Sequence, residues 1–264
     1  MKTSSNLLIV AVATMVLMAT PAQADSWVAK SYEIKDVTEV VAAGGCRMEI
    51  VQGNSDSLRV EAKPDTLARL KVDQTDHKLT LSIKNFDGGF NPFRWFDGHN
   101  DELRYFLQLK NLNRLDLAGA CNARIGNWTG KNMSIYAAGA SRTDFATLNL
   151  ENFLIEQSGA SNSSFQQISV GRLSFNLSGA ANAEIKTAGT GNYLKVEASG
   201  ASNYRGKPLQ IVEADLSASG ASNIDVNATE KLRAEASGAS NIRYLGQPRL
   251  QSQTSGASNV HAIN

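Results

Sequence analysis

The pentapeptide SGASN (219–223) and its copies decide the fold of this chain. SGASN occurs five times, and the altered copies AGACN (118–122), AGASR (138–142) and SGAAN (178–182) bring the total to eight. Successive copies are 18 to 21 residues apart, which is typical of a solenoid rather than of scattered ligand motifs. The first glycines of the copies are Gly119, Gly139, Gly159, Gly179, Gly200, Gly220, Gly238 and Gly256.

The residues on both sides of each glycine alternate as β-strands do. Before Gly220, the apolar Ala214, Leu216 and Ala218 alternate with polar neighbours, and the other copies largely repeat this pattern. A second, mostly apolar column lies six residues after each glycine. We therefore predict an all-β protein, a parallel β-helix with coils of about 20 residues, right-handed by the crossover rule.

Each pentapeptide is expected to form the corner between two strands of one coil. Glycine adopts the positive φ that a sharp corner needs, and alanine and serine are small enough to stack. The asparagine is expected to bond its equivalents in neighbouring coils, as an internal ladder. A column of alternating charge is interpreted as structural, because it favours one register of the coils. It contains Glu184, Arg205, Asp225 and Arg243.

The N-terminus has the features of a secretory signal. Residues 1–24 contain Lys2, an apolar run over 7–18 and the small-residue pattern Ala22-Gln23-Ala24, so we expect cleavage before Asp25 and an exported protein, periplasmic, surface-bound or extracellular. No later segment approaches a membrane span of about 20 apolar residues. Without Lys2, 25 of the 26 basic residues remain and balance the 25 acidic ones, so no nucleic-acid partner is expected.

We predict a single β-solenoid domain over 25–264. Residues 111–264 contain the regular repeats, whereas 25–110 are expected to form irregular coils and strands. VTEVVAAGGCRMEIVQG (37–53) fits the repeat columns around Gly44, and the alternating segments that follow predict strands separated by turns at NSD, KPDT and QTDH.

The two cysteines occupy the same position of the repeat. Cys46 and Cys121 each lie two residues after a corner glycine. If their coils stack directly, the Cα atoms should be about 4.8 Å apart, inside the range of about 4.4–6.8 Å that a disulfide requires. The chain 47–120 would then leave the stack and return one coil higher. The alternative is a pair of small buried thiols.

An aromatic segment interrupts the pattern. NFDGGFNPFRWFDGHND (85–101) contains five of the eighteen aromatic residues of the chain. One interpretation is a loop that caps the open end of the core. The other is an exposed surface that binds a sugar ring or a partner protein. The candidate contacts are Phe90, Phe93, Arg94, Trp95 and Phe96.

Catalytic and metal chemistry are not expected. A polysaccharide-cleaving solenoid needs clustered carboxylates, and the acidic side chains here are spread along the repeats without a DD or DxD motif. His77, His99 and His261 are far apart and have no zinc-type spacing, and no phosphate-binding glycine pattern or cofactor motif is found. The carboxylates considered are Asp144, Glu156, Glu184, Glu197, Asp215, Asp225 and Glu235.

The order of these blocks resembles the bacterial head GIN domain family of putative auto-transporter adhesins. The resemblance rests on the exported N-terminus, VVAAGGCRMEIVQG, the strand-rich block 56–84 and the tandem SGASN corners. It implies a right-handed parallel β-helix and a role in adhesion. We therefore expect a noncatalytic exported binding or adhesion protein, with a glycan or a surface protein as its partner. An envelope protein that self-associates into homo-oligomers and a polysaccharide-active enzyme are the alternatives.

Overall fold

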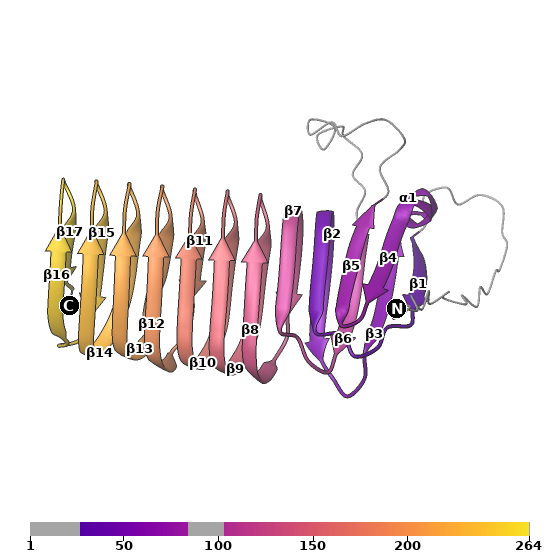
Figure 1. Ribbon diagram of the computed structural model, residues 1–264, viewed down its shortest axis with the longest axis horizontal. Helices are drawn as coiled ribbons and strands as arrows, with labels where there is room; N and C mark the ends of the chain where they lie inside the picture. The colour runs from indigo at the N-terminus through magenta and orange to yellow at the C-terminus, as the bar shows by residue number, and fades with distance from the viewer. Residues whose placement is uncertain (1–26, 84–102, 264) are drawn as a thin grey trace, which may run out of the picture.

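The computed structural model describes residues 27–83 and 103–263 (Figure 1). The expected signal sequence 1–24 and the whole aromatic segment 85–101, including its five candidate contact residues, lie outside these ranges. The elements are β1 (Val28–Tyr32), β2 (Glu39–Gln52), β3 (Ser57–Ala62), α1 (Pro64–Arg69), β4 (Leu70–Thr75), β5 (Lys78–Ile83), β6 (Leu103–Leu109), β7 (Arg114–Ile125), β8 (Trp128–Ala137), β9 (Arg142–Gln157), β10 (Asn162–Leu177), β11 (Asn182–Ile185), β12 (Gly189–Ala198), β13 (Asn203–Ala218), β14 (Asn223–Ala236), β15 (Asn241–Leu245), β16 (Arg249–Thr254) and β17 (Asn259–Ala262).

The chain from β7 onward is a parallel β-solenoid, which confirms the predicted fold class. Each coil pairs in parallel with the next over as many as three segments: one before the corner, one after it and a short third one. The coils of β9 and β10 match residue for residue, so that Phe165 pairs with Phe145 and Leu173 with Phe153, whereas β13 and β14 pair with shifts of register between Arg205 and Glu213. Figure 1 shows the coils side by side along the long axis, with the corners in one row.

All eight predicted corner glycines have positive φ, from +73° at Gly256 to +92° at Gly119, and the corner at Gly44 has +108°. A second constraint acts from one coil to the next. A Cβ on Gly220 would lie 2.6 Å from the carbonyl oxygen of Gly200, which accepts a hydrogen bond from the Ala221 amide at 2.7 Å. The corner therefore requires glycine both for its φ and for the close approach of two backbones.

The second serine of the pentapeptide closes the corner. The buried Ser222 hydroxyl donates to the carbonyl oxygen of Ser219 at 2.7 Å and lies 3.0 Å from that of Ala198 in the preceding coil. Ser202, Ser240 and Ser258 make the same bond within their corners. This serine is thus selected for a hydrogen bond inside the turn and not for its small size alone.

The asparagine ladder exists but runs on the outer surface, which corrects the expectation of an internal stack. Each side-chain amide donates to the oxygen of the preceding coil at 2.9–3.2 Å, from Asn241 back to Asn162. These side chains are half-buried or exposed. The residue before each of these asparagines, Ala181 in one coil and serine in the others, is buried, so the alternation of the strand directs the asparagine outward.

The core is a continuous column of apolar side chains with aromatic rings at its centre. Phe145 and Phe165 stack at 4.7 Å between ring centroids, and Phe175 lies 4.8 Å from Tyr204. Tyr204 takes the space that Gly206 leaves, because a Cβ at Gly206 would lie 2.5 Å from the tyrosine hydroxyl oxygen. In the coil of β10 the equivalent positions hold the small Ser163 and the large Phe165. The large and the small residue have thus exchanged places in the coil of β13, so the packed volume of the coil is kept.

The Tyr204 hydroxyl is buried and has no hydrogen-bond partner among the described residues, and burial raises its pKa. Replacing Tyr204 with phenylalanine should therefore raise the free energy of unfolding by about 1 kcal/mol, because an unsatisfied buried donor is removed. Tyr193→Phe, at a half-buried outer position, is the matched control and should have no effect. Denaturant titration decides, and a lower stability for Tyr204→Phe would show that the hydroxyl has a partner in solution.

The N-terminal strands close one end of the solenoid. β2 pairs in parallel with β7 on one side, with Gly44 opposite Gly119, and with β5 and β6 on the other. β3 runs antiparallel to β6 and β1, and β4 is antiparallel to β5. The turn expected at KPDT is instead the start of α1, where Pro64 supplies a favourable first-turn residue and Asp65 an acidic one.

A disulfide joins Cys46 and Cys121, which confirms both the bond and the stacking order on which its prediction rested. Their Cα atoms are 4.5 Å apart, and the two residues are paired in the β2–β7 register. The bond closes the 75-residue separation over which the chain leaves the stack and returns.

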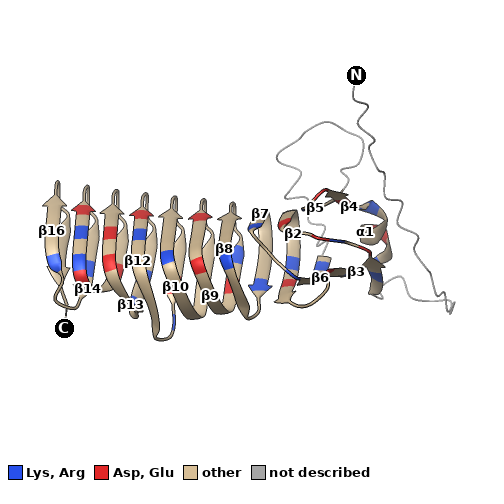
Figure 2. Ribbon diagram, turned by 60° about the horizontal axis from the view of Figure 1, so that its bottom comes forward, with Lys and Arg blue, Asp and Glu red and all other residues tan. Residues whose placement is uncertain are grey.

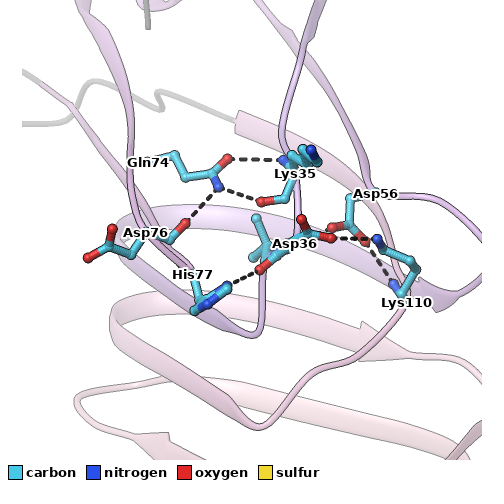
Figure 3. A network of polar contacts seen from close by, with 8 residues as sticks. Lys35, Asp36, Asp56, Gln74, Asp76, His77 and Lys110 are labelled. Carbon is cyan, nitrogen blue, oxygen red and sulfur yellow. Dashed lines mark hydrogen bonds and ion pairs between the residues drawn. The ribbon is translucent and has the colours of Figure 1, made fainter. Parts of the chain in front are cut away.

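A polar network, which we call the polar clasp, joins the residues just before β2 to the segment 47–120, which leaves the stack and returns to it (Figure 3). The Lys110 ammonium lies 2.6 Å from the Asp36 carboxylate, and His77 donates from Nδ1 to the Asp36 carbonyl oxygen at 2.7 Å. The hydrogen bond and charge of Lys110 lower the pKa of Asp36. The clasp comprises Lys35, Asp36, Asp56, Gln74, Asp76, His77 and Lys110.

Candidate functional groove

A groove of about 680 Å³ runs along the solenoid and is the best candidate for a functional site. Two residues of each coil form most of its outer lining: the residue three positions before the corner glycine and the residue one position before it. Seven coils contribute, from Val41 to Ser219. At about 4.8 Å per coil, the groove is about 29 Å long. We call these two rows the wall column and the floor column.

The floor column consists of small residues. It contains Ala118, Ala138, Ser158, Ser178 and Ser199, all five of which are exposed. Their small side chains leave a flat surface, because nothing long projects from the strand beside the corner. This follows from the pentapeptide itself, whose first residue is alanine or serine in every copy.

The wall column is polar, and carboxylates occupy every second coil. The strand register places Tyr136 next to Glu156, Asn176 between Glu156 and Glu197, and Ser217 beyond Glu197. Asp116 and Glu235 continue the alternation at the two ends. Figure 2 shows the acidic residues near the tips of alternate strands. The wall of the groove therefore carries a carboxylate on every second coil, and the floor carries no charged side chain.

A smaller hollow of about 350 Å³ lies on the face after the corner. Asp144 is held there by the Arg142 guanidinium at 3.0 Å and by the Ser164 hydroxyl at 2.7 Å. Burial favours the neutral acid, but the hydrogen bonds from Arg142 and Ser164 outweigh it, so the pKa of Asp144 is lowered. These partners satisfy the carboxylate internally, and we interpret this hollow as structural.

The low pKa of Asp144 makes a sign-specific prediction about pH. Its contribution to stability should be fully present above the ordinary aspartate pKa of 3.8 and should disappear as the pH falls through the lower folded value. Asp144→Asn should thus be less stable than wild type at neutral pH and equally stable in strong acid. Thermal melts over this pH range test it, with Asp215→Asn, at a half-buried position outside the hollow, as control. A difference independent of pH would contradict the assignment.

The carboxylates considered from the sequence are not gathered into one site. Glu156 and Glu197 line the groove, whereas Asp144 and Glu184 line the smaller hollow on another face. In the charge column, Arg243 lies 2.6 Å from Asp225; the Asp225 side chain is 8% exposed and the Arg243 side chain 41%, so this pair is partly buried rather than fully exposed as expected. Sequence reasoning treated the wall column as a strand face and did not single out Tyr136 or Asn176.

Within 27–83 and 103–263, no group of three or more His, Cys, Asp or Glu side chains is placed to hold a metal ion. A search of the same residues for a helix with the length and hydropathy of a membrane span finds none.

The fold and groove define a class of protein: a disulfide-linked parallel β-solenoid with an axial groove and an N-terminal closing sheet. The chain belongs to the family described as "Putative auto-transporter adhesin, head GIN domain", whose model matches residues 36–248. Membership of this family and the disulfide indicate an exported protein.

Several solved structures share this fold over nearly their whole length. A putative lipid binding protein from Parabacteroides distasonis is 19% identical, with a TM-score of 0.81 over 91% of this chain and 98% of that one. A putative adhesin from Parabacteroides merdae is 16% identical, with a TM-score of 0.76 over 91% and 97% of the two chains. No curated protein matches the chain. At these identities the likeness establishes the fold alone.

Proposed function

We propose that this protein is a noncatalytic binding protein of the cell envelope, exposed in the periplasm or at the surface, that holds an extended glycan along its groove. The observation that carries the proposal is the continuity of the groove over seven coils. Each coil presents the same floor at the same spacing, and a polymer of repeating units is the ligand that matches a repeating surface. The adhesin family agrees with a binding role.

The distribution of the carboxylates supports binding rather than cleavage. Glycoside hydrolysis uses two acidic side chains that flank one bond. Along the wall column no two carboxylates come from neighbouring coils, and three of the four have a cation on the same strand. Such acids are suited to hold a fixed charge rather than to exchange a proton.

A glycan array followed by calorimetry on residues 25–264 tests the proposal. Ser178→Tyr places a ring on the groove floor and should abolish glycan binding while the fold is kept. Ser169→Tyr, on an exposed strand position outside the groove, is the matched control and should bind normally. Binding of no glycan by the wild type, or equal losses in both variants, would overturn the proposal.

One observation favours self-association as a second function. The last full strand, β16, is exposed at all six residues and has no partner on its outer side among the described strands, and Leu250 is 38% exposed. An unpaired strand edge is a template for a second chain. Sedimentation should then show a dimer that Leu250→Lys dissociates, and a monomer at all concentrations would exclude this function.

A further inference from the structure

The carboxylates of the wall column differ in whether a basic side chain of the protein pairs with them. Three of them have a basic residue two positions earlier on the same strand, pointing to the same side. Arg114 Nε lies 2.9 Å from Asp116, Lys195 Nζ 2.6 Å from Glu197, and Arg233 Nη2 2.5 Å from Glu235. The protein itself thus balances these three charges.

Glu156 is the exception. The position two residues earlier is occupied by Leu154, and no cation among the described residues pairs with the Glu156 carboxylate. Within the described part of the chain, the one hydrogen bond to this carboxylate comes from the Asn176 side-chain amide, at the long distance of 3.5 Å. Glu156 is half-buried and lines the groove near its middle, with Tyr136 and Asn176 on the neighbouring coils. An unbalanced charge at such a site attracts a cation more strongly than a fully exposed charge does.

We infer that Glu156 binds the protonated amine of an amino sugar within the glycan that occupies the groove. This inference rests on the proposed function and specifies its ligand. A lone carboxylate is too few ligands for Ca²⁺, which takes six to eight oxygens, whereas one ammonium forms a charge-assisted hydrogen bond with one carboxylate.

The groove favours a glycan over a basic peptide. Peptides gain affinity by adding a strand to a free sheet edge, but the coils that carry Tyr136, Glu156 and Asn176 are paired on both sides. The flat floor of alanine and serine also offers no separate pockets for the long side chains of a peptide. Sugar rings that lie along the floor require neither feature.

Calorimetry with two β-1,4-linked glucosamine oligosaccharides of equal length tests the inference. One is fully N-acetylated and the other is free of acetyl groups, and mildly acidic buffer keeps the amines protonated. Wild type should prefer the free amine by about tenfold or more, since a hydrogen bond between charged groups is that strong. Glu156→Gln should remove this preference. Glu197→Gln, which changes a cation-paired carboxylate of the same column, should retain it.

The outcomes separate the two levels of the proposal. Equal binding of both oligosaccharides, or a preference that Glu156→Gln does not alter, would overturn the amine site and leave glycan binding in place. Binding of neither oligosaccharide, together with no signal on the array, would overturn both. If an oligolysine peptide binds in a Glu156-dependent manner while no sugar does, the occupant is a basic peptide and the glycan assignment is wrong.

Discussion

Gly220→Val is expected to lower the free energy of unfolding by about 3–5 kcal/mol. A β-branched residue at positive φ is strained by about 1–3 kcal/mol, and forcing extra atoms into a packed region adds a similar amount. The second term follows from the structure, because the new Cβ would lie 2.6 Å from the Gly200 carbonyl oxygen and would push two coils apart. For a domain of this size the melting midpoint should fall by about 10 °C.

The neighbouring Ala221→Val is the matched control for this substitution. Ala221 is exposed in the same corner and is not among the described residues with positive φ. It should therefore tolerate valine with little change in the midpoint. If Gly220→Val melts at the wild-type temperature, the corner geometry and the close approach of the two coils are both refuted.

Removal of the disulfide is expected to lower the free energy of unfolding by almost as much as Gly220→Val does. Replacing both Cys46 and Cys121 with alanine should lower the free energy of unfolding by about 4 kcal/mol, because the unfolded chain regains the freedom of a loop of some 75 residues. The effect should concentrate in β2 and in the strands β3–β6 of the excursion. Hydrogen exchange should stay slow in the coils of β13 and β14, since solenoid repeats contact only their neighbours.

Reduction of the wild type is the control for this pair of substitutions. The reduced protein and the alanine variant should have the same midpoint, which separates the covalent bond from the packing of two sulfur atoms. The intact protein should also be lighter by two hydrogen atoms than its reduced form in mass spectrometry. Equal stability of the oxidised and reduced proteins would show that the bond contributes nothing, and two free thiols would contradict the bond itself.

The binding predictions are independent of these stability effects. Ser178→Tyr and Glu156→Gln change groove positions that face outward, and both keep the corner glycine. Ser178→Tyr removes one hydrogen bond, from the Ser178 hydroxyl to the Gln157 carbonyl oxygen at 3.2 Å. A variant that melts like wild type and loses binding would thus assign the loss to the groove. The closing end of the solenoid, with the polar clasp, lies beyond this surface, since none of the clasp residues lines the groove.

The sequence by itself determined the features that repeat. The period of 18–21 residues, the alternation of apolar and polar positions and the corner glycines are local or periodic properties, so they are legible without coordinates. The disulfide was predictable for the same reason: Cys46 and Cys121 share a column, and stacking converts a shared column into a short distance. The aromatic segment, which carried the original binding hypothesis, lies outside the described residues, so that hypothesis remains a prediction.

Only the tertiary structure decided which side of each coil a polar residue faces and what lies next to it. The asparagine ladder is external because the corner turns the preceding residue inward. Tyr204 fits in the core because Gly206 leaves room within the same coil. The groove, and the missing cation at Glu156, emerge when seven coils bring equivalent positions to about 4.8 Å. These contacts join residues some 20 positions apart, and their chemistry depends on side-chain direction across coils, which no single strand pattern contains.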